Sequence, residues 1–172
     1  MLDPVPDARP ATPHPAMIDL GAPAVRPATD ADAPAIGRLL DAFNREYDEP
    51  TPGPEALAER SAYLLSLDTL VLLAGGGPDG LAVMRFRPAI WSQALECYLA
   101  ELYVVPDKRG RGLGRALMLA AIKTARDRGA DRIDLGTSED DHAARALYES
   151  LGFINRERGP EGPITYFYEL EL

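Results

Sequence analysis

The stretch from Leu99 to Ala125 joins an apolar run to a turn crowded with glycine and arginine, and then to an amphipathic pattern. From Leu99 to Val105 nearly every side chain is apolar, which is typical of a strand covered on both faces. Pro106 ends this strand. From Leu113 onward apolar residues recur at helical spacing, and Gly129 follows a basic run that suits a helix C-terminus. The pattern therefore predicts a strand, a turn and a long helix in succession.

The turn carries three glycines at alternate positions, Gly110, Gly112 and Gly114. They leave main-chain N–H groups without side-chain cover where the first unpaired N–H groups of the helix point outward. Three arginines add positive charge to the same turn: Arg109, Arg111 and Arg115. A loop of this kind is expected to bind a phosphate or a pyrophosphate.

Two common phosphate loops do not fit the turn. A P-loop requires a lysine followed by serine or threonine after its last glycine, and the turn contains no such pair. The dinucleotide fingerprint requires a third glycine where this chain has Arg115, and its strand normally lies near the start of the domain. A role in binding nucleotides is therefore disfavoured.

Two signatures together resemble the GNAT superfamily of acyl-CoA N-acyltransferases. The first is Arg109-x-x-Gly112-x-Gly114 after a strand ending in Val-Val-Pro, which is similar to the family's coenzyme A pyrophosphate loop. The second follows about thirty residues later and reads Ala-x-x-Leu-Tyr-x-x-x-Gly-Phe, with Ala144, Leu147, Tyr148, Gly152 and Phe153. The order of strands and helices from about residue 95 to 157 also agrees with the family.

The resemblance implies an α/β fold with a mixed, mostly antiparallel sheet, flanked by about four helices. Its fourth and fifth strands would splay apart, and acetyl-CoA would enter the gap. The residues implied to bind this cofactor are Leu102, Tyr103, Val104, Arg109, Gly110, Arg111, Gly112, Leu113, Gly114, Arg115, Asp141, Ala144 and Tyr148. Leu102 to Val104 would act through their main chain. Asp141 stands where the family usually has Asn, and a carboxylate cannot donate the hydrogen bond that Asn would give.

Residues 1–22 are rich in Pro, Ala and Asp and are expected to form a disordered tail, within which Met17 is an alternative start. Residues 23–172 are expected to form one domain. Strands are expected at Ala24–Pro27, Thr69–Ala74, Leu81–Phe86, Leu99–Val105, Asp131–Thr137, Phe153–Arg156 and Thr165–Leu170. Helices are expected around Ile36–Phe43, at Glu55–Leu67, from Leu113 to Arg128 and at Asp141–Leu151.

Two residues are candidates for the chemistry of acyl transfer. Tyr148 matches the family's tyrosine that protonates the leaving thiolate, although a partly buried structural tyrosine is the alternative. Glu101 lies in an apolar strand, where a carboxylate is costly unless it faces a wet cleft. Many relatives carry a base near this position, and a bystander carboxylate at the sheet surface is the alternative. His142 is expected to face solvent.

The chain of 172 residues has a net charge of −9, which disfavours nucleic acid and anionic membranes and would attract a cationic substrate. Its only cysteine, Cys97, cannot form an internal disulfide, and no apolar run reaches the roughly 18 residues of a membrane span. No targeting segment is evident, so a cytoplasmic location is expected. No metal site is expected.

The family builds its acceptor pocket from the loop between the first two helices, the loop before the central strand and the C-terminal strands. The corresponding residues here are Phe43, Glu46, Tyr47, Asp48, Glu49, Arg87, Trp91, Tyr166 and Tyr168. Carboxylates beside aromatic rings suit an ammonium group, although a solvated acidic loop explains the same residues equally well.

The sequence thus predicts an N-acetyltransferase that moves an acetyl group from acetyl-CoA to a small cationic primary amine, by direct attack in a ternary complex. An acyl-CoA-binding regulatory module and a protein or peptide N-acetyltransferase are the alternatives. Many members of the family pair through sheet edges or C-terminal strands, so a homodimer is a further possibility.

Overall fold

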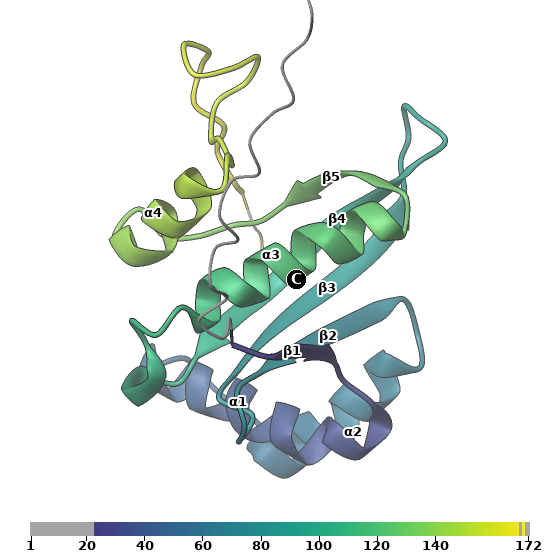
Figure 1. Cartoon of the computed structure of the whole chain (residues 1–172), viewed down its shortest axis with the longest axis vertical. Coiled ribbons are helices and arrows are strands. Elements are labelled where there is room, and N and C mark those ends of the chain that lie inside the picture. Colours follow the sequence, from purple (N-terminus) through teal and green to yellow (C-terminus); the bar gives the residue numbers. More distant parts are fainter. Residues whose placement is uncertain (1–22, 169, 171–172) are drawn as a thin grey trace, which may run out of the picture.

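The computed structural model describes residues 23–168 and residue 170, which contain one five-stranded sheet (Figure 1). Its strands are β1 (Val25–Pro27), β2 (Thr69–Ala74), β3 (Gly80–Pro88), β4 (Leu95–Val104) and β5 (Ala130–Asp134). They lie in the order β1-β2-β3-β4-β5, and all neighbours are antiparallel except β4 and β5, which are parallel. The predicted mixed, mostly antiparallel sheet is confirmed.

Four α-helices flank this sheet, as predicted: α1 (Ala33–Glu46), α2 (Pro54–Leu65), α3 (Leu113–Asp127) and α4 (His142–Ser150). Short 3₁₀ turns at Asp30–Asp32 and Pro106–Lys108 precede α1 and α3. The long α3 connects β4 to β5, because two parallel neighbours cannot be joined by a hairpin. No helix in the described part of the chain is long and apolar enough to span a membrane.

Apolar side chains on both faces of β2, β3 and β4 explain why the sheet lies between two helical layers. On one face α3 buries Leu117, Met118 and Ala121 against the sheet. On the other face α1 buries Ile36 and Leu39. Figure 1 shows α3 lying across the sheet and α1 and α2 gathered on its other side. Each large aliphatic side chain buried in this way contributes about 1.5–3 kcal/mol of transfer free energy.

The parallel strands β4 and β5 part from each other halfway along β4. Their ladder begins at Leu95, opposite Ala130, and ends at Tyr98, opposite Asp134, while β4 continues to Val104. Just beyond Tyr98, β4 bulges: Leu99 faces Met84 and Glu101 faces Val83, so Ala100 has no partner residue on β3. The predicted splay of the fourth and fifth strands is therefore present in the fold.

Two of the expected strand boundaries change at this splay. β5 ends at Asp134 and not at Thr137, because the following residues have no β4 partner beyond the point where the strands part. β4 begins at Leu95, earlier than the expected Leu99, because Leu95 to Tyr98 pair with β3 as well as β5.

The prediction that Phe153–Arg156 and Thr165–Leu170 finish the sheet is wrong for the residues that the structure describes. Arg156 and Ile164 form an isolated antiparallel bridge, and neither segment joins β5. Tyr166, Phe167 and Tyr168 are largely exposed. Their pattern has high β propensity, but a strand also requires a ladder partner, which the local pattern cannot supply. The predicted tail at 1–22 lies outside the described residues.

Candidate active site

A cleft of about 620 Å³ opens where β4 and β5 part. One wall is the C-terminal half of β4, and the opposite wall is formed by residues 135–138 and by α4. The glycine turn and the first residues of α3 lie at one end, and Phe43, Tyr47 and Glu49 come from the region around the end of α1. The fold thus brings residues from three distant parts of the chain to one concave surface.

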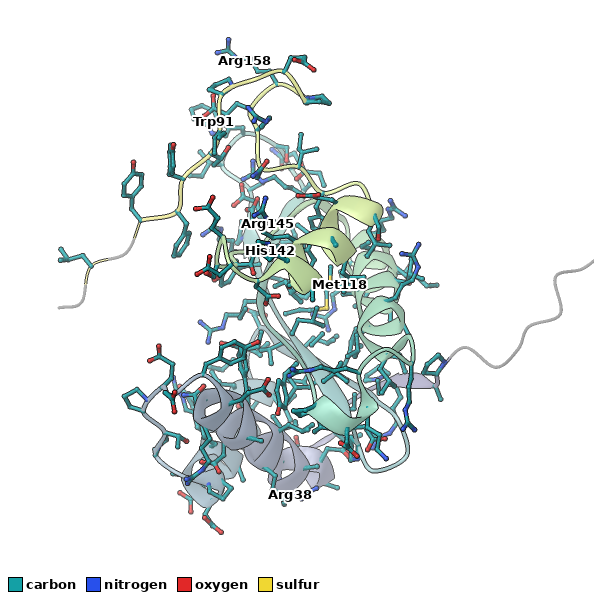
Figure 2. All side chains as sticks on the ribbon, turned by 90° about the vertical axis from the view of Figure 1, so that its left-hand side faces the viewer. Arg38, Trp91, Met118, His142, Arg145 and Arg158 are labelled. Carbon is teal, nitrogen blue, oxygen red and sulfur yellow. The ribbon has the colours of Figure 1, made fainter. Side chains whose placement is uncertain are left out.

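Most of the residues singled out from the sequence line this cleft. They are Phe43, Tyr47, Glu49, Glu101, Leu102, Tyr103, Val104, Arg109, Gly110, Gly112, Leu113, Gly114, Arg115, Asp141, Ala144 and Tyr148. The remaining candidates do not line it: Glu46, Asp48, Arg87, Trp91, Arg111, Tyr166 and Tyr168. Figure 2 shows Trp91 at the end of the molecule where Arg158 lies, opposite the end that carries Arg38 of α1.

Gly112 is the N-cap of α3 and adopts a left-handed conformation with φ of 82°. Only glycine reaches this backbone conformation without a steric cost. The first hydrogen bond of the helical series runs from Ala116 N–H to the Gly112 carbonyl at 2.9 Å. The N–H groups of Leu113, Gly114 and Arg115 therefore precede this series and have no acceptor within the helix.

Unpaired N–H groups and the positive end of the α3 dipole make this turn suitable for an anion. An added Cβ at Gly112 would meet no atom within 4 Å, so the space outside the turn is open. The backbone of this turn could therefore hold a phosphate or pyrophosphate group.

The three arginines of the turn have different surroundings. The Arg109 guanidinium forms a two-bond ion pair with the Glu46 carboxylate at 2.7 and 2.8 Å. Arg115 donates to the Ser150 hydroxyl at 2.9 Å and so links α3 to α4. Arg111 is exposed. The charge of Arg109 is thus neutralised by Glu46, and Arg111 and Arg115 are better placed to attract an anion.

Tyr148 lies on the cleft-facing side of α4 and is only 8% exposed. Its ring packs near Phe153, with centroids 6.0 Å apart. Burial raises the pKa of Tyr148 to about 12, and the nearby Asp141 carboxylate contributes to the shift. The phenol is therefore fully protonated at neutral pH and can donate a proton into the cleft.

Glu101 follows the bulge in β4 and lines the same cleft. Burial raises the pKa of its carboxyl group, and the positive charge of Arg85 partly opposes this effect. A carboxylate with a raised pKa is a stronger base than an exposed one, which suits the removal of a proton from an amine.

Asp141 caps α4, because its Oδ1 accepts a hydrogen bond from the Ala144 N–H at 2.9 Å. The carboxylate that replaces the family's usual Asn therefore has a structural role at this helix N-terminus. The neighbouring His142 is exposed, as predicted, and does not line the cleft.

Residues 135–138 also line the cleft, although the sequence pattern predicts a strand from Leu135 to Thr137. The run Gly-Thr-Ser after Leu135 is more typical of a loop than of a strand interior, and this signal could have indicated the loop. No local pattern predicts the pairing of Glu46 with Arg109, because the two residues are 63 positions apart.

Comparison with known proteins shows the family of this chain. The sequence pattern of the acetyltransferase (GNAT) family matches residues 36–153, and the chain belongs to this family. A protein of Arthrobacter sp. FB24 with a known crystal structure is 40% identical, with a TM-score of 0.79. The match covers 90% of this chain and 99% of that one.

Two relatives carry named activities of their own. The aminoglycoside N(6′)-acetyltransferase type 1 of Stenotrophomonas maltophilia is 31% identical over 149 residues, which cover 85% of this chain and 92% of that protein. The mycothiol acetyltransferase of Thermobispora bispora is 38% identical over 130 residues, which cover 72% of this chain. The match covers only 38% of that relative's length.

Proposed function

We propose that this protein transfers an acetyl group from acetyl-CoA to a primary amine of a small cationic molecule. The observation that carries the proposal is the cleft between β4 and β5, where the N-terminus of α3, the half-buried Glu101 carboxylate and the buried Tyr148 phenol line one surface. Membership of the GNAT family supports the acetyl transfer itself.

The main chain of the glycine turn would hold the pyrophosphate of acetyl-CoA, through the N–H groups from Gly110 to Arg115. Leu102 to Val104 would align the rest of the coenzyme along β4, because this half of the strand has no β5 partner and its outer edge faces the cleft. The bound coenzyme supplies a thioester whose carbonyl carbon accepts the amine. Holding the acetyl group and the acceptor in one cleft favours direct attack in a ternary complex.

Glu101 would remove a proton from the acceptor ammonium, directly or through a water molecule, and so expose the attacking lone pair. This role requires the ionised carboxylate, and therefore the rate is expected to rise with pH through the raised pKa of Glu101. Tyr148 would donate its proton to the departing sulfur. Its raised pKa keeps the phenol protonated until that step.

A cationic acceptor is supported by acidic and aromatic groups at the α1 end of the cleft. Phe43 and Tyr47 pack edge to face with centroids 5.3 Å apart, and Glu49 also lines the cleft. Aromatic faces and a carboxylate together favour an ammonium group. The likeness to an aminoglycoside acetyltransferase agrees with this class of acceptor, as does the net charge of −9.

The direct test is a thiol-release assay with acetyl-CoA over a panel of amines that includes polyamines, aminoglycosides, peptides with free N-termini and protein lysines. Release of coenzyme A with a small polycation, and not with peptides, is the expected result. Acetylation of peptides or protein lysines alone would contradict the proposed acceptor class. Tight binding of acetyl-CoA without acetylation of any amine would favour the regulatory module instead.

A homodimer and a cytoplasmic location remain predictions. In the described part of the chain, β5 forms one edge of the sheet and the segment after Ile164 exposes several aromatic side chains. A second copy of the protein could pack against either of these surfaces. Light scattering on the purified protein would measure the oligomeric mass. Cell fractionation would test the location.

A further inference from the structure

The ion pair between Glu46 and Arg109 joins the end of α1 to the glycine turn, two regions that border the cleft. Glu46 is the last residue of α1. Arg109 directly precedes the glycine turn from Gly110 to Gly114, which is proposed to hold the coenzyme and is called the coenzyme turn. Two parallel hydrogen bonds of 2.7 and 2.8 Å connect the guanidinium to the carboxylate. This forked geometry fixes the orientation of both groups, which a single contact would not do.

The guanidinium of Arg109 also has two contacts to β4. Its Nε donates to the Val104 carbonyl at 2.9 Å, and its central carbon lies 5.7 Å from the centre of the Tyr103 ring. One side chain therefore ties the start of the coenzyme turn to the end of β4 and to the end of α1. The Arg109 guanidinium also lowers the pKa of Glu46, so the pair is fully ionised at neutral pH.

The end of α1 carries the aromatic groups of the acceptor side. Phe43 lies one turn before Glu46 and packs on Tyr103, with ring centroids 5.2 Å apart, and Tyr47 directly follows Glu46. Both Phe43 and Tyr47 line the cleft. A shift of the Arg109 side chain would thus move the end of α1, and with it Phe43 and Tyr47.

We infer that Glu46 and Arg109 act as a pair of positioning residues, which transmit the ordering of the coenzyme turn to the acceptor wall of the cleft. The inference rests on the proposed function, because acetyl-CoA is the ligand that orders the turn. When the backbone N–H groups of the turn close on the pyrophosphate, Arg109 is held in place, and through Glu46 it holds Phe43 and Tyr47. Coenzyme bound first then prepares the acceptor side.

This assignment changes the role expected for Glu46. Arg109 neutralises the charge of Glu46, and Glu46 does not line the cleft, so the acceptor's positive charge is left to the acids that do line it, Glu49 and Glu101. Glu46 therefore contributes to the acceptor site through the helix that it fixes.

The test is hydrogen–deuterium exchange of the full chain with and without acetyl-CoA, in the wild type and in Glu46→Gln. In the wild type, acetyl-CoA should slow exchange about tenfold both in peptides covering 109–117 and in peptides covering 41–50. In Glu46→Gln, the slowing should persist at 109–117 and be lost at 41–50. Arg109→Lys, which keeps the charge without the fork, should lose most of the effect at 41–50.

Asp41→Asn is the matched control. It breaks another ion pair of α1, in which Arg45 Nε donates to Asp41 at 2.8 Å, but this pair has no contact with the coenzyme turn. Both peptides should still be protected by acetyl-CoA in this variant, and this result separates coupling from a general loosening of the helix.

Slowing at 41–50 in Glu46→Gln that equals the wild type would overturn the inference, as would slowing confined to 109–117 in the wild type. Both of these outcomes leave the proposed function standing. If acetyl-CoA slows exchange in neither segment of the wild type, the turn does not bind it. That outcome contradicts the proposed function, and the coupling is overturned with it.

Discussion

Leu113 and Tyr148 lie on the side of the cleft proposed to bind the coenzyme, which is called the coenzyme side, and both are less than a tenth exposed. Tyr47 lies at the α1 end of the cleft, which is proposed to bind the acceptor and is called the acceptor side, and it is about half exposed. The coenzyme side is formed by a helix N-terminus and by side chains that belong to the main core beneath α3. The acceptor side is formed by the end of α1 and the loop that follows it. Packing therefore fixes the geometry of the coenzyme side, while the acceptor side depends on a few polar and aromatic contacts.

This contrast predicts that substitutions on the coenzyme side have the larger effects. Gly112→Val is expected to weaken acetyl-CoA binding by about 100-fold or more, because each lost hydrogen bond to a charged phosphate costs about 1.5–3 kcal/mol. The added side chain strains the left-handed backbone and covers the N–H groups at the start of α3. Titration calorimetry with acetyl-CoA measures the change.

Gly129→Val is the matched control for this variant, because Gly129 follows the other end of α3 and has the same φ of 82°. It lies outside the cleft, so it should lower the melting temperature to a similar degree and leave the affinity for acetyl-CoA unchanged. Equal losses of affinity in both variants would show that strain in α3, and not cover of the turn, is responsible.

Tyr148→Phe is expected to lower kcat by about 100-fold, the usual range for loss of a general acid. KM for both substrates should change little, because the ring and its packing near Phe153 remain. Steady-state kinetics with the best amine of the panel measures both constants. A rise in KM without a fall in kcat would indicate that the phenol only orients the coenzyme.

Glu101→Gln should lower the rate by about tenfold at pH 7 and remove the limb of the pH profile that rises with pH. The same variant should be more stable than the wild type at neutral pH. Since the folded protein raises the pKa of Glu101, the ionised carboxylate destabilises the fold, and this cost is present above the folded pKa.

At a pH below the ordinary glutamate pKa of about 4.3 the group is protonated in both states and the cost disappears. The stability gain of Glu101→Gln, measured by urea unfolding, should therefore be largest near neutral pH and absent in acid. A variant that is less stable at pH 7, with an unaltered rate profile, would identify Glu101 as a structural carboxylate.

The coenzyme side of the cleft could be predicted from the sequence better than the acceptor side. The strand before Pro106, the glycine turn and the helix from Leu113 are local features, and each is encoded by residues close together in the chain. The splay of β4 and β5 followed from a resemblance to a family and not from these patterns. The bulge at Ala100 depends on pairing with β3, which a pattern along one strand cannot reveal.

The acceptor side depends on contacts between distant residues. Phe43 and Tyr47 reach the cleft as the sequence suggested, but Glu46 is paired with Arg109 from another region of the chain. The aromatic pattern at Tyr166 and Tyr168 indicated a strand, although whether it pairs depends on a sheet edge elsewhere. Local propensity could not decide either point.

The smallest expected effects test whether the acceptor side is confined to the cleft. Trp91 is 94% exposed and Tyr166 is 69% exposed, and neither lines the cleft. Trp91→Ala and Tyr166→Ala should therefore change the acceptor KM by less than about twofold, which corresponds to less than about 0.5 kcal/mol of binding free energy. Tyr47→Ala should raise it several-fold, because that ring lines the cleft. If Trp91→Ala or Tyr166→Ala raises KM as much as Tyr47→Ala, the acceptor contacts residues outside the cleft.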